Sequence, residues 1–75
     1  MSSGTIAIAV GIMMALGAGL PALAQGLVAG KAMEAIARQP EAAGQVRSTM
    51  ILALGLIEAL TIYCLLIGFM LVGKI

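Results

Sequence analysis

Two long apolar segments enclose one charged segment, and this arrangement constrains the fold more than any other feature of the sequence. Residues 1–30 contain no Asp, Glu, Lys, Arg or His, and residues 48–73 contain one carboxylate, Glu58, as their only charge. Each segment exceeds the roughly 20 residues that a helix needs to cross the hydrocarbon core of a membrane. Because 63% of the 75 residues are hydrophobic, the sequence predicts a membrane protein rather than a soluble domain.

The polar segment between them, KAMEAIARQPEAAGQVR, holds all the remaining charges except Lys74. Pro40 cannot continue a helical hydrogen-bond ladder and disfavours helical geometry at Gln39, so the turn is predicted here. The predicted fold is an all-α transmembrane hairpin that forms a single domain, residues 1–75. Its parts are a first transmembrane helix with an extension beyond the membrane at 5–37, a polar loop at 38–43 and a second transmembrane helix at 44–73.

A signal peptide is the competing interpretation of the first apolar segment, because Ala22 and Ala24 form the A-x-A pattern of a cleavage site. Residues 1–10 contain no Lys or Arg, however, and the apolar character continues beyond the candidate cleavage site through residues 26–30. Both features argue against cleavage. The first segment is therefore expected to remain as a membrane-spanning helix.

The basic residues predict the orientation of the hairpin. The polar segment carries Lys31, Arg38 and Arg47, whereas the far end carries only Lys74. Since cytoplasmic loops are enriched in Lys and Arg, the loop is expected in the cytoplasm and both termini on the opposite side.

Small residues recur at intervals of four along the first predicted helix, at Ala18, Ala22, Gly26 and Gly30. Such a stripe lets helix backbones approach closely within lipid, where no hydrophobic force drives one helix toward another. The stripe could simply pack the first helix against the second. Its length exceeds what one partner helix requires, so the sequence favours a homo-oligomer in which helices from several copies meet.

Glu58 has one polar counterpart at the same predicted depth. The midpoint between Gln25 and Glu58 falls between Glu41 and Ala42, within the predicted loop, so the two side chains should face each other across the hairpin. A glutamine amide can donate a hydrogen bond to a carboxyl oxygen. Tyr63 lies about 7.5 Å further along the helix axis, and its phenol is expected to reach back toward Glu58 because helical side chains lean toward the N-terminus.

A carboxylate at the bilayer centre costs at least ~3 kcal/mol, so Glu58 is expected to bind a proton or a cation. The alternative is that Glu58 and Gln25 merely fasten the two helices together. Interhelical hydrogen bonds in membranes average only ~0.6 kcal/mol, which is a small gain for a carboxyl group where Gln or Ser would serve. A functional role for Glu58 is therefore favoured.

Three features together closely resemble the c subunit of the F-type rotary ATP synthase, and the resemblance covers nearly the whole chain. They are the polar segment with its Arg38-Gln39-Pro40 loop, the small-residue stripe before it, and the sequence EALTIY that begins at Glu58. The resemblance implies a ring of identical hairpins, with first helices inside and second helices outside. It places the ring in an energy-transducing membrane, expected to be the bacterial plasma membrane, as a rotor that carries ions and catalyses no reaction.

The resemblance also implies roles for individual residues. Glu58 would match the ion-carrying carboxylate, Gln25 and Tyr63 its hydrogen-bonding neighbours, and the Leu56 carbonyl a backbone acceptor. The loop residues Arg38, Gln39 and Pro40 would contact the gamma and epsilon subunits of the central stalk. The other implied partners are the a subunit of the membrane sector and membrane lipid. The glycine-rich pattern of the family's first helix is altered here, with alanine or leucine at several of its positions.

The residues after Glu58 favour a proton over sodium as the carried ion. Sodium needs several oxygen ligands, and sodium-carrying relatives supply hydroxyl groups directly after the glutamate, where this chain has Ala59 and Leu60. A sodium-carrying ring is one alternative, and a holin-like pore, a structural hairpin or a small transporter proteolipid are others, but the last three leave the Arg-Gln-Pro loop unexplained. No cofactor, metal site or nucleic-acid partner is expected.

Overall fold

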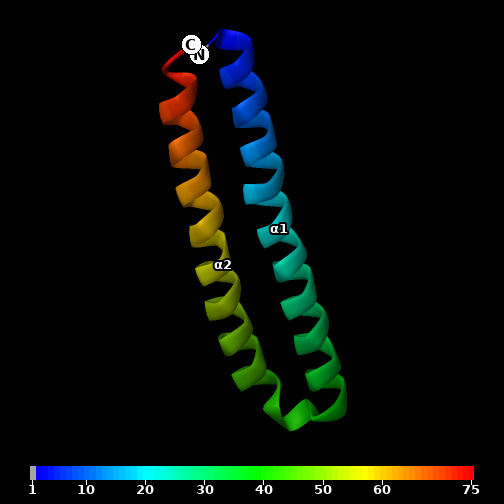
Figure 1. Cartoon of the computed structure of the whole chain (residues 1–75). Helices are drawn as coiled ribbons and strands as arrows, with labels where there is room; N and C mark the ends of the chain where they lie inside the picture. Colours follow the sequence, from blue (N-terminus) through cyan, green and yellow to red (C-terminus); the bar gives the residue numbers. More distant parts are fainter. Residues whose placement is uncertain (1) are drawn as a thin grey trace.

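Two long antiparallel helices joined by a tight turn make up the computed structural model, which describes residues 2–75. Helix α1 spans Ser3–Arg38, the short 3-10 helix η1 spans Pro40–Ala42, and α2 spans Ala43–Val72. The helices lie side by side along their whole length, with η1 at one end of the hairpin and the start of α1 beside the end of α2 at the other (Figure 1). The hairpin is 57 Å long and 15 Å across. The predicted helical hairpin is confirmed.

Local capping and the turn residues set the helix ends. The Ser2 hydroxyl accepts a hydrogen bond of 3.1 Å from the Thr5 backbone N–H, so α1 begins two residues before the predicted start. At the other end Gln39 leaves helical geometry, with φ −134° and ψ 75°, because it precedes Pro40. Its N–H still donates to the Ala35 carbonyl at 2.9 Å.

The turn is shorter than the predicted loop at 38–43. Arg38 belongs to the last turn of α1, where a positive charge interacts favourably with the carbonyl end of the helix dipole. Pro40 begins η1, a position that its fixed φ suits, and α2 begins directly after η1 at Ala43. Helix α2 ends at Val72, one residue before the predicted end, and Gly73 follows it. Only the boundaries differ, by one or two residues.

Glycines allow the closest contacts between α1 and α2. A Cβ atom on Gly17 would lie 2.9 Å from the Cys64 Cβ and would overlap the thiol sulfur. One on Gly68 would lie 3.3 Å from the Met14 sulfur. The Cys64 thiol donates to the Met13 carbonyl at 3.5 Å, so this half-buried cysteine packs as a small side chain between the helices. The two helices approach most closely where one of them lacks a side chain.

The predicted small-residue stripe does not pack against α2. Ala22, Gly26 and Gly30 are exposed, Ala18 is half-buried, and a Cβ atom added to Gly26 or Gly30 would meet no atom within 4 Å. The intrachain contact instead uses other positions of α1, so the stripe is left for neighbours outside the hairpin, and its part in ring packing stays a prediction.

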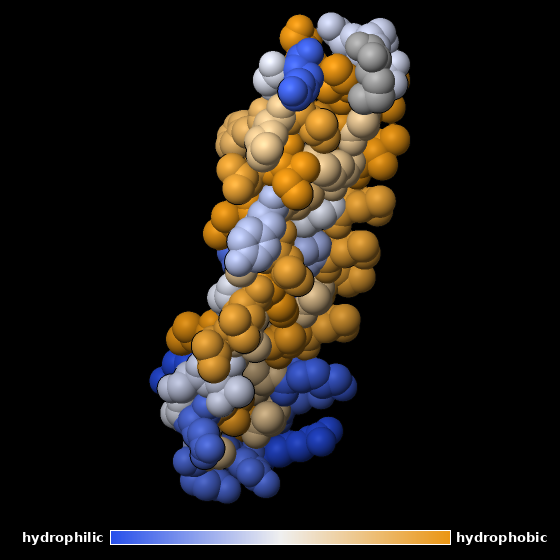
Figure 2. All heavy atoms as spheres, turned by 60° about the vertical axis from the view of Figure 1, so that its left-hand side comes forward, coloured by the Kyte–Doolittle hydropathy of each residue, from blue (hydrophilic) through white to orange (hydrophobic). Residues whose placement is uncertain are grey.

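Very little of the hairpin is buried within a single copy. Among residues 2–75 only Ile6, Ala32 and Gly68 are buried, while bulky side chains such as Leu20 and Leu27 are about 60% exposed. Figure 2 shows a broad hydrophobic band next to a strongly hydrophilic end. Both helices are long and apolar enough to cross a membrane. The surface of the hairpin is therefore suited to lipid and to further helices rather than to water.

Candidate functional site

Gln25 and Glu58 meet across the hairpin, as their symmetric spacing about the turn predicts. The Gln25 Nε2 atom donates to a Glu58 carboxyl oxygen at 3.0 Å. Glu58 lies near the midpoint of α2, so the pair occupies the middle of the apolar band. Because the antiparallel helices place residues equidistant from the turn at the same depth, one short turn is enough to bring these two polar side chains together.

Leu54 supplies a second contact, one that was not predicted from the sequence. The same Gln25 Nε2 atom donates to the Leu54 carbonyl at 3.2 Å. Leu54 precedes Glu58 by four residues, so the two lie on one face of α2, and its carbonyl can accept the amide as well as the helical N–H of Glu58. Both N–H groups of the Gln25 amide thus have acceptors on α2, which fixes the amide beside the carboxylate. The position of Leu54, four residues before Glu58 on the same helix face, is a sequence signal that could have identified its carbonyl as an acceptor for Gln25.

Leu56 and Tyr63, two residues predicted for the site, are not joined to Glu58 within one hairpin. Gln25 bonds to the Leu54 carbonyl and not to that of Leu56. The Tyr63 side chain is 63% exposed, and its phenol has no hydrogen-bond partner among residues 2–75. Five residues turn a helix by about 500°, so Tyr63 points about 140° away from Glu58. A role for Tyr63 or the Leu56 carbonyl at Glu58 would therefore need a neighbouring copy, and it stays a prediction.

Glu58 has no counter-ion in the described part of the chain. The only ion pair among residues 2–75 joins Lys31 to Glu34 at 3.7 Å, near the turn, and both side chains are largely exposed. The Glu58 carboxyl group is exposed on the flank of the hairpin, with Gln25 as its one side-chain partner. An ionised carboxylate in the hydrocarbon core would therefore be uncompensated, and a bound proton or cation would neutralise it.

The predicted loop residues Arg38, Gln39 and Pro40 are exposed at the turn. They lie at the turn end of the hairpin (Figure 1), about half the length of α2 from Glu58. The structure thus separates two surfaces, a polar one at the turn and an acidic site within the apolar band. No cluster of three or more His, Cys, Asp or Glu residues that could hold a metal occurs in residues 2–75.

Comparison with known proteins agrees with this arrangement over nearly the whole chain. The family described as the C subunit of ATP synthase matches residues 8–71. The ATP synthase c subunit of Carboxydothermus hydrogenoformans is 51% identical over 96% of this chain and 88% of its own length. The c subunit of Syntrophomonas wolfei is 54% identical over 81% of this chain and 96% of its own. The chloroplastic c subunit of Euglena gracilis is 49% identical over 81% and 75%.

The matched residues include the charged turn and most of both apolar helices. The matches imply a c-ring within an energy-transducing membrane, associated with other ATP synthase subunits. The chain therefore belongs to the family of ATP synthase c subunits, whose members are non-catalytic rotor subunits of the membrane sector.

Proposed function

We propose that this protein carries protons by reversible protonation of Glu58 and thereby couples ion flow to rotation of the ring and to ATP synthesis. The observation that carries the proposal is the hydrogen bond of 3.0 Å from Gln25 to a mid-membrane carboxyl group that has no counter-ion in residues 2–75. A group in this position is neutral while it faces lipid and ionises only where water or a cation reaches it.

The side chains around Glu58 support a proton rather than sodium as the carried ion. A hard cation such as sodium requires several oxygen ligands. Ala59 and Leu60 supply no side-chain oxygen, so the Glu58 carboxylate and the Gln25 amide are the side chains that bring oxygen atoms to the site. A protonated carboxyl group needs only one acceptor for its O–H, and we propose the Leu56 carbonyl for this role.

Movement of the ring would bring each Glu58 in turn from lipid to a polar half-channel. We infer that the a subunit, the neighbour of the ring in the membrane, provides this channel and a positive charge that favours ionisation. Each elementary charge that moves across a potential of 100 mV releases about 2.3 kcal/mol, so successive copies can drive rotation against a load. The chain itself supplies the carboxyl group, its hydrogen-bonding partner and the rigid helix that positions them.

The exposed turn supports contacts with the soluble part of the enzyme. Lys31, Arg38 and Arg47 gather at this end of the hairpin, which favours a cytoplasmic turn with both termini on the other side. We propose that Arg38, Gln39 and Pro40 contact the gamma and epsilon subunits of the central stalk. The exposed position of all three residues agrees with such contacts.

Labelling by a hydrophobic carbodiimide tests the proton assignment, because this reagent attacks the protonated carboxyl group. In membranes that contain the assembled ring, Glu58 should be modified faster as the pH falls, and sodium at matched ionic strength should give no protection. Glu58→Gln is the control for site specificity and should remain unmodified. Protection by sodium but not by potassium would show that the ring carries sodium.

A further inference from the structure

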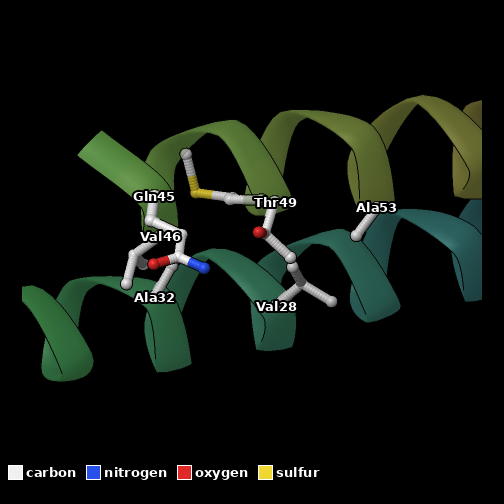
Figure 3. Close-up of a pocket in the computed structure, with 7 residues that line it drawn as sticks. Val28, Ala32, Gln45, Val46, Thr49 and Ala53 are labelled. Atoms are coloured by element: carbon white, nitrogen blue, oxygen red, sulfur yellow. The ribbon is translucent and has the colours of Figure 1, made fainter. Parts of the chain in front are cut away.

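An apolar pocket opens between the helices near the turn, at a place that the ion site does not use. It has a volume of about 350 Å³. Val28 and Ala32 of α1 and Val46, Met50 and Ala53 of α2 form its apolar walls, and Gln45 and Thr49 form a polar rim (Figure 3). Gln45 and Thr49 are exposed. A hollow of this size, with no side chain of its own chain to fill it, requires an occupant within a membrane.

The pocket and Glu58 lie on opposite flanks of the hairpin. Thr49 precedes Glu58 by nine residues, which is a rotation of about 180° around α2. Gly68, which packs against α1, lies about 80° from Glu58 and about 100° from Thr49, so neither residue faces α1 directly. We call the two sides the Glu58 flank and the pocket flank.

Ring symmetry determines which residues can reach the pocket. In a ring with α1 inside and α2 outside, the two flanks of each hairpin face its two neighbours. Contacts in a cyclic ring are heterologous, which means that two different surfaces meet, so the Glu58 flank of one copy meets the pocket flank of the next. Rotation about an axis normal to the membrane keeps equivalent residues at equal depth, so contacts between neighbours join residues at similar heights. The occupant must therefore come from the Glu58 flank, near the depth of Thr49.

Ile51 of the adjacent copy meets both conditions. It precedes Glu58 by seven residues, which places it within about 20° of the direction of Glu58, and it lies only about 3 Å from the level of Thr49. Its side chain is 60% exposed in the hairpin. Arg47 lies one turn earlier on the same flank and is also exposed. A branched aliphatic side chain with a guanidinium group beside it is complementary to an apolar pocket with amide and hydroxyl oxygens at its rim.

We propose that this pocket binds the side chain of Ile51 from the neighbouring copy. The neighbour's Arg47 then donates hydrogen bonds to the side-chain oxygens of Gln45 and Thr49 at the rim. Each copy then seats Ile51 in one neighbour and receives Ile51 from the other. The contact fixes the relative height of adjacent hairpins on the turn side of the ion site. It depends on ring assembly but not on which ion Glu58 carries.

Disulfide formation between neighbours tests the contact. Thr49→Cys and Ile51→Cys are combined in a Cys64→Ala background, and membranes that contain the ring are treated with a mild oxidant. The two new thiols point to opposite sides of one helix and cannot pair within a chain. The expected result is a ladder of covalent oligomers that extends to the full ring, whereas either cysteine alone leaves monomers. Dimers from Thr49→Cys alone would instead show two pocket flanks facing each other and would overturn the proposal.

Two controls keep the test decisive. In the control pair Ser48→Cys and Thr49→Cys both positions are exposed, but Ser48 is rotated about 80° from Glu58 and about 100° from Thr49, so this pair should give no ladder. Assembly is measured separately by native electrophoresis, and intact rings without a ladder would show that the pocket holds lipid or remains open. If the double variant fails to assemble, Ile51→Ala and Leu52→Ala are compared. Ile51→Ala should lower the temperature at which the ring dissociates and Leu52→Ala should not, so equal effects would overturn the proposal.

Discussion

Replacement of Gly17 by alanine should open the hairpin locally and expose Cys64. The added Cβ atom would lie 2.9 Å from the Cys64 Cβ and would overlap the sulfur of this half-buried side chain. Overpacking of this kind costs roughly 1–3 kcal/mol. The helix propensity of alanine does not offset this cost, because α1 stays helical in the membrane when the hairpin opens. A cost of about 1–3 kcal/mol raises the population of open hairpins by a factor of about 5–150.

The rate at which Cys64 reacts with a membrane-permeable maleimide measures this opening. The thiol is half-buried and bonded to the Met13 carbonyl, so the reagent reaches it chiefly when α1 and α2 separate. Gly17→Ala should accelerate labelling about 5–150-fold. Gly44→Ala is the matched control, because a Cβ atom on Gly44 would meet no atom within 4 Å, and it should leave the rate unchanged. Equal rates in the two variants would show that the helices do not depend on close approach at Gly17.

Two further changes separate the ion site from the turn. Glu58→Gln keeps a hydrogen-bonding partner for Gln25 but cannot release a proton, so rings should still form in the membrane while proton-driven ATP synthesis is lost. Coupled synthesis at the normal rate in this variant would contradict the role of Glu58. Arg38→Ala or Pro40→Ala should leave insertion intact and release the soluble part of the enzyme from washed membranes, measured as ATPase activity that remains bound. Full retention of coupled activity would show that these residues form the turn but do not contact the central stalk.

The register of the hairpin was predictable because a two-helix fold has one main variable, the position of its turn. Pro40 marks the turn, and the midpoint between Gln25 and Glu58 falls within one or two residues of it. The hydrogen bond of 3.0 Å between these side chains agrees with a turn at Pro40. Once the turn is placed, the rise of each helix gives the depth of the other residues. Exact helix ends depended on capping by Ser2 and on the backbone of Gln39, which are local details that hydropathy does not contain.

Rotation around each helix was harder to infer than depth. Axial distance alone cannot show whether Tyr63 reaches the Glu58 of its own hairpin, because the intervening five residues turn it to another side of α2. The same difficulty concealed Leu54, whose carbonyl accepts from Gln25 on the face that it shares with Glu58. In a helix that is apolar on all sides, no contrast between polar and apolar faces reveals which direction points to the partner helix. Only the rare polar side chains and the close contacts at glycines provide this information.

The small buried core of the hairpin explains why its functional site faces outward. Only three of residues 2–75 are buried, so one copy cannot enclose a carboxyl group, and Glu58 remains exposed beside its single partner Gln25. Burial of a whole ion site inside one hairpin would need more helices or would block the exchange of protons with a channel. An exposed carboxyl group on the flank can be covered by a neighbouring copy and lipid, and can still be uncovered by a polar partner. A single hairpin buries few of its residues and therefore depends on neighbours in a ring. Because Glu58 is exposed for the same reason, it can bind and release its ion.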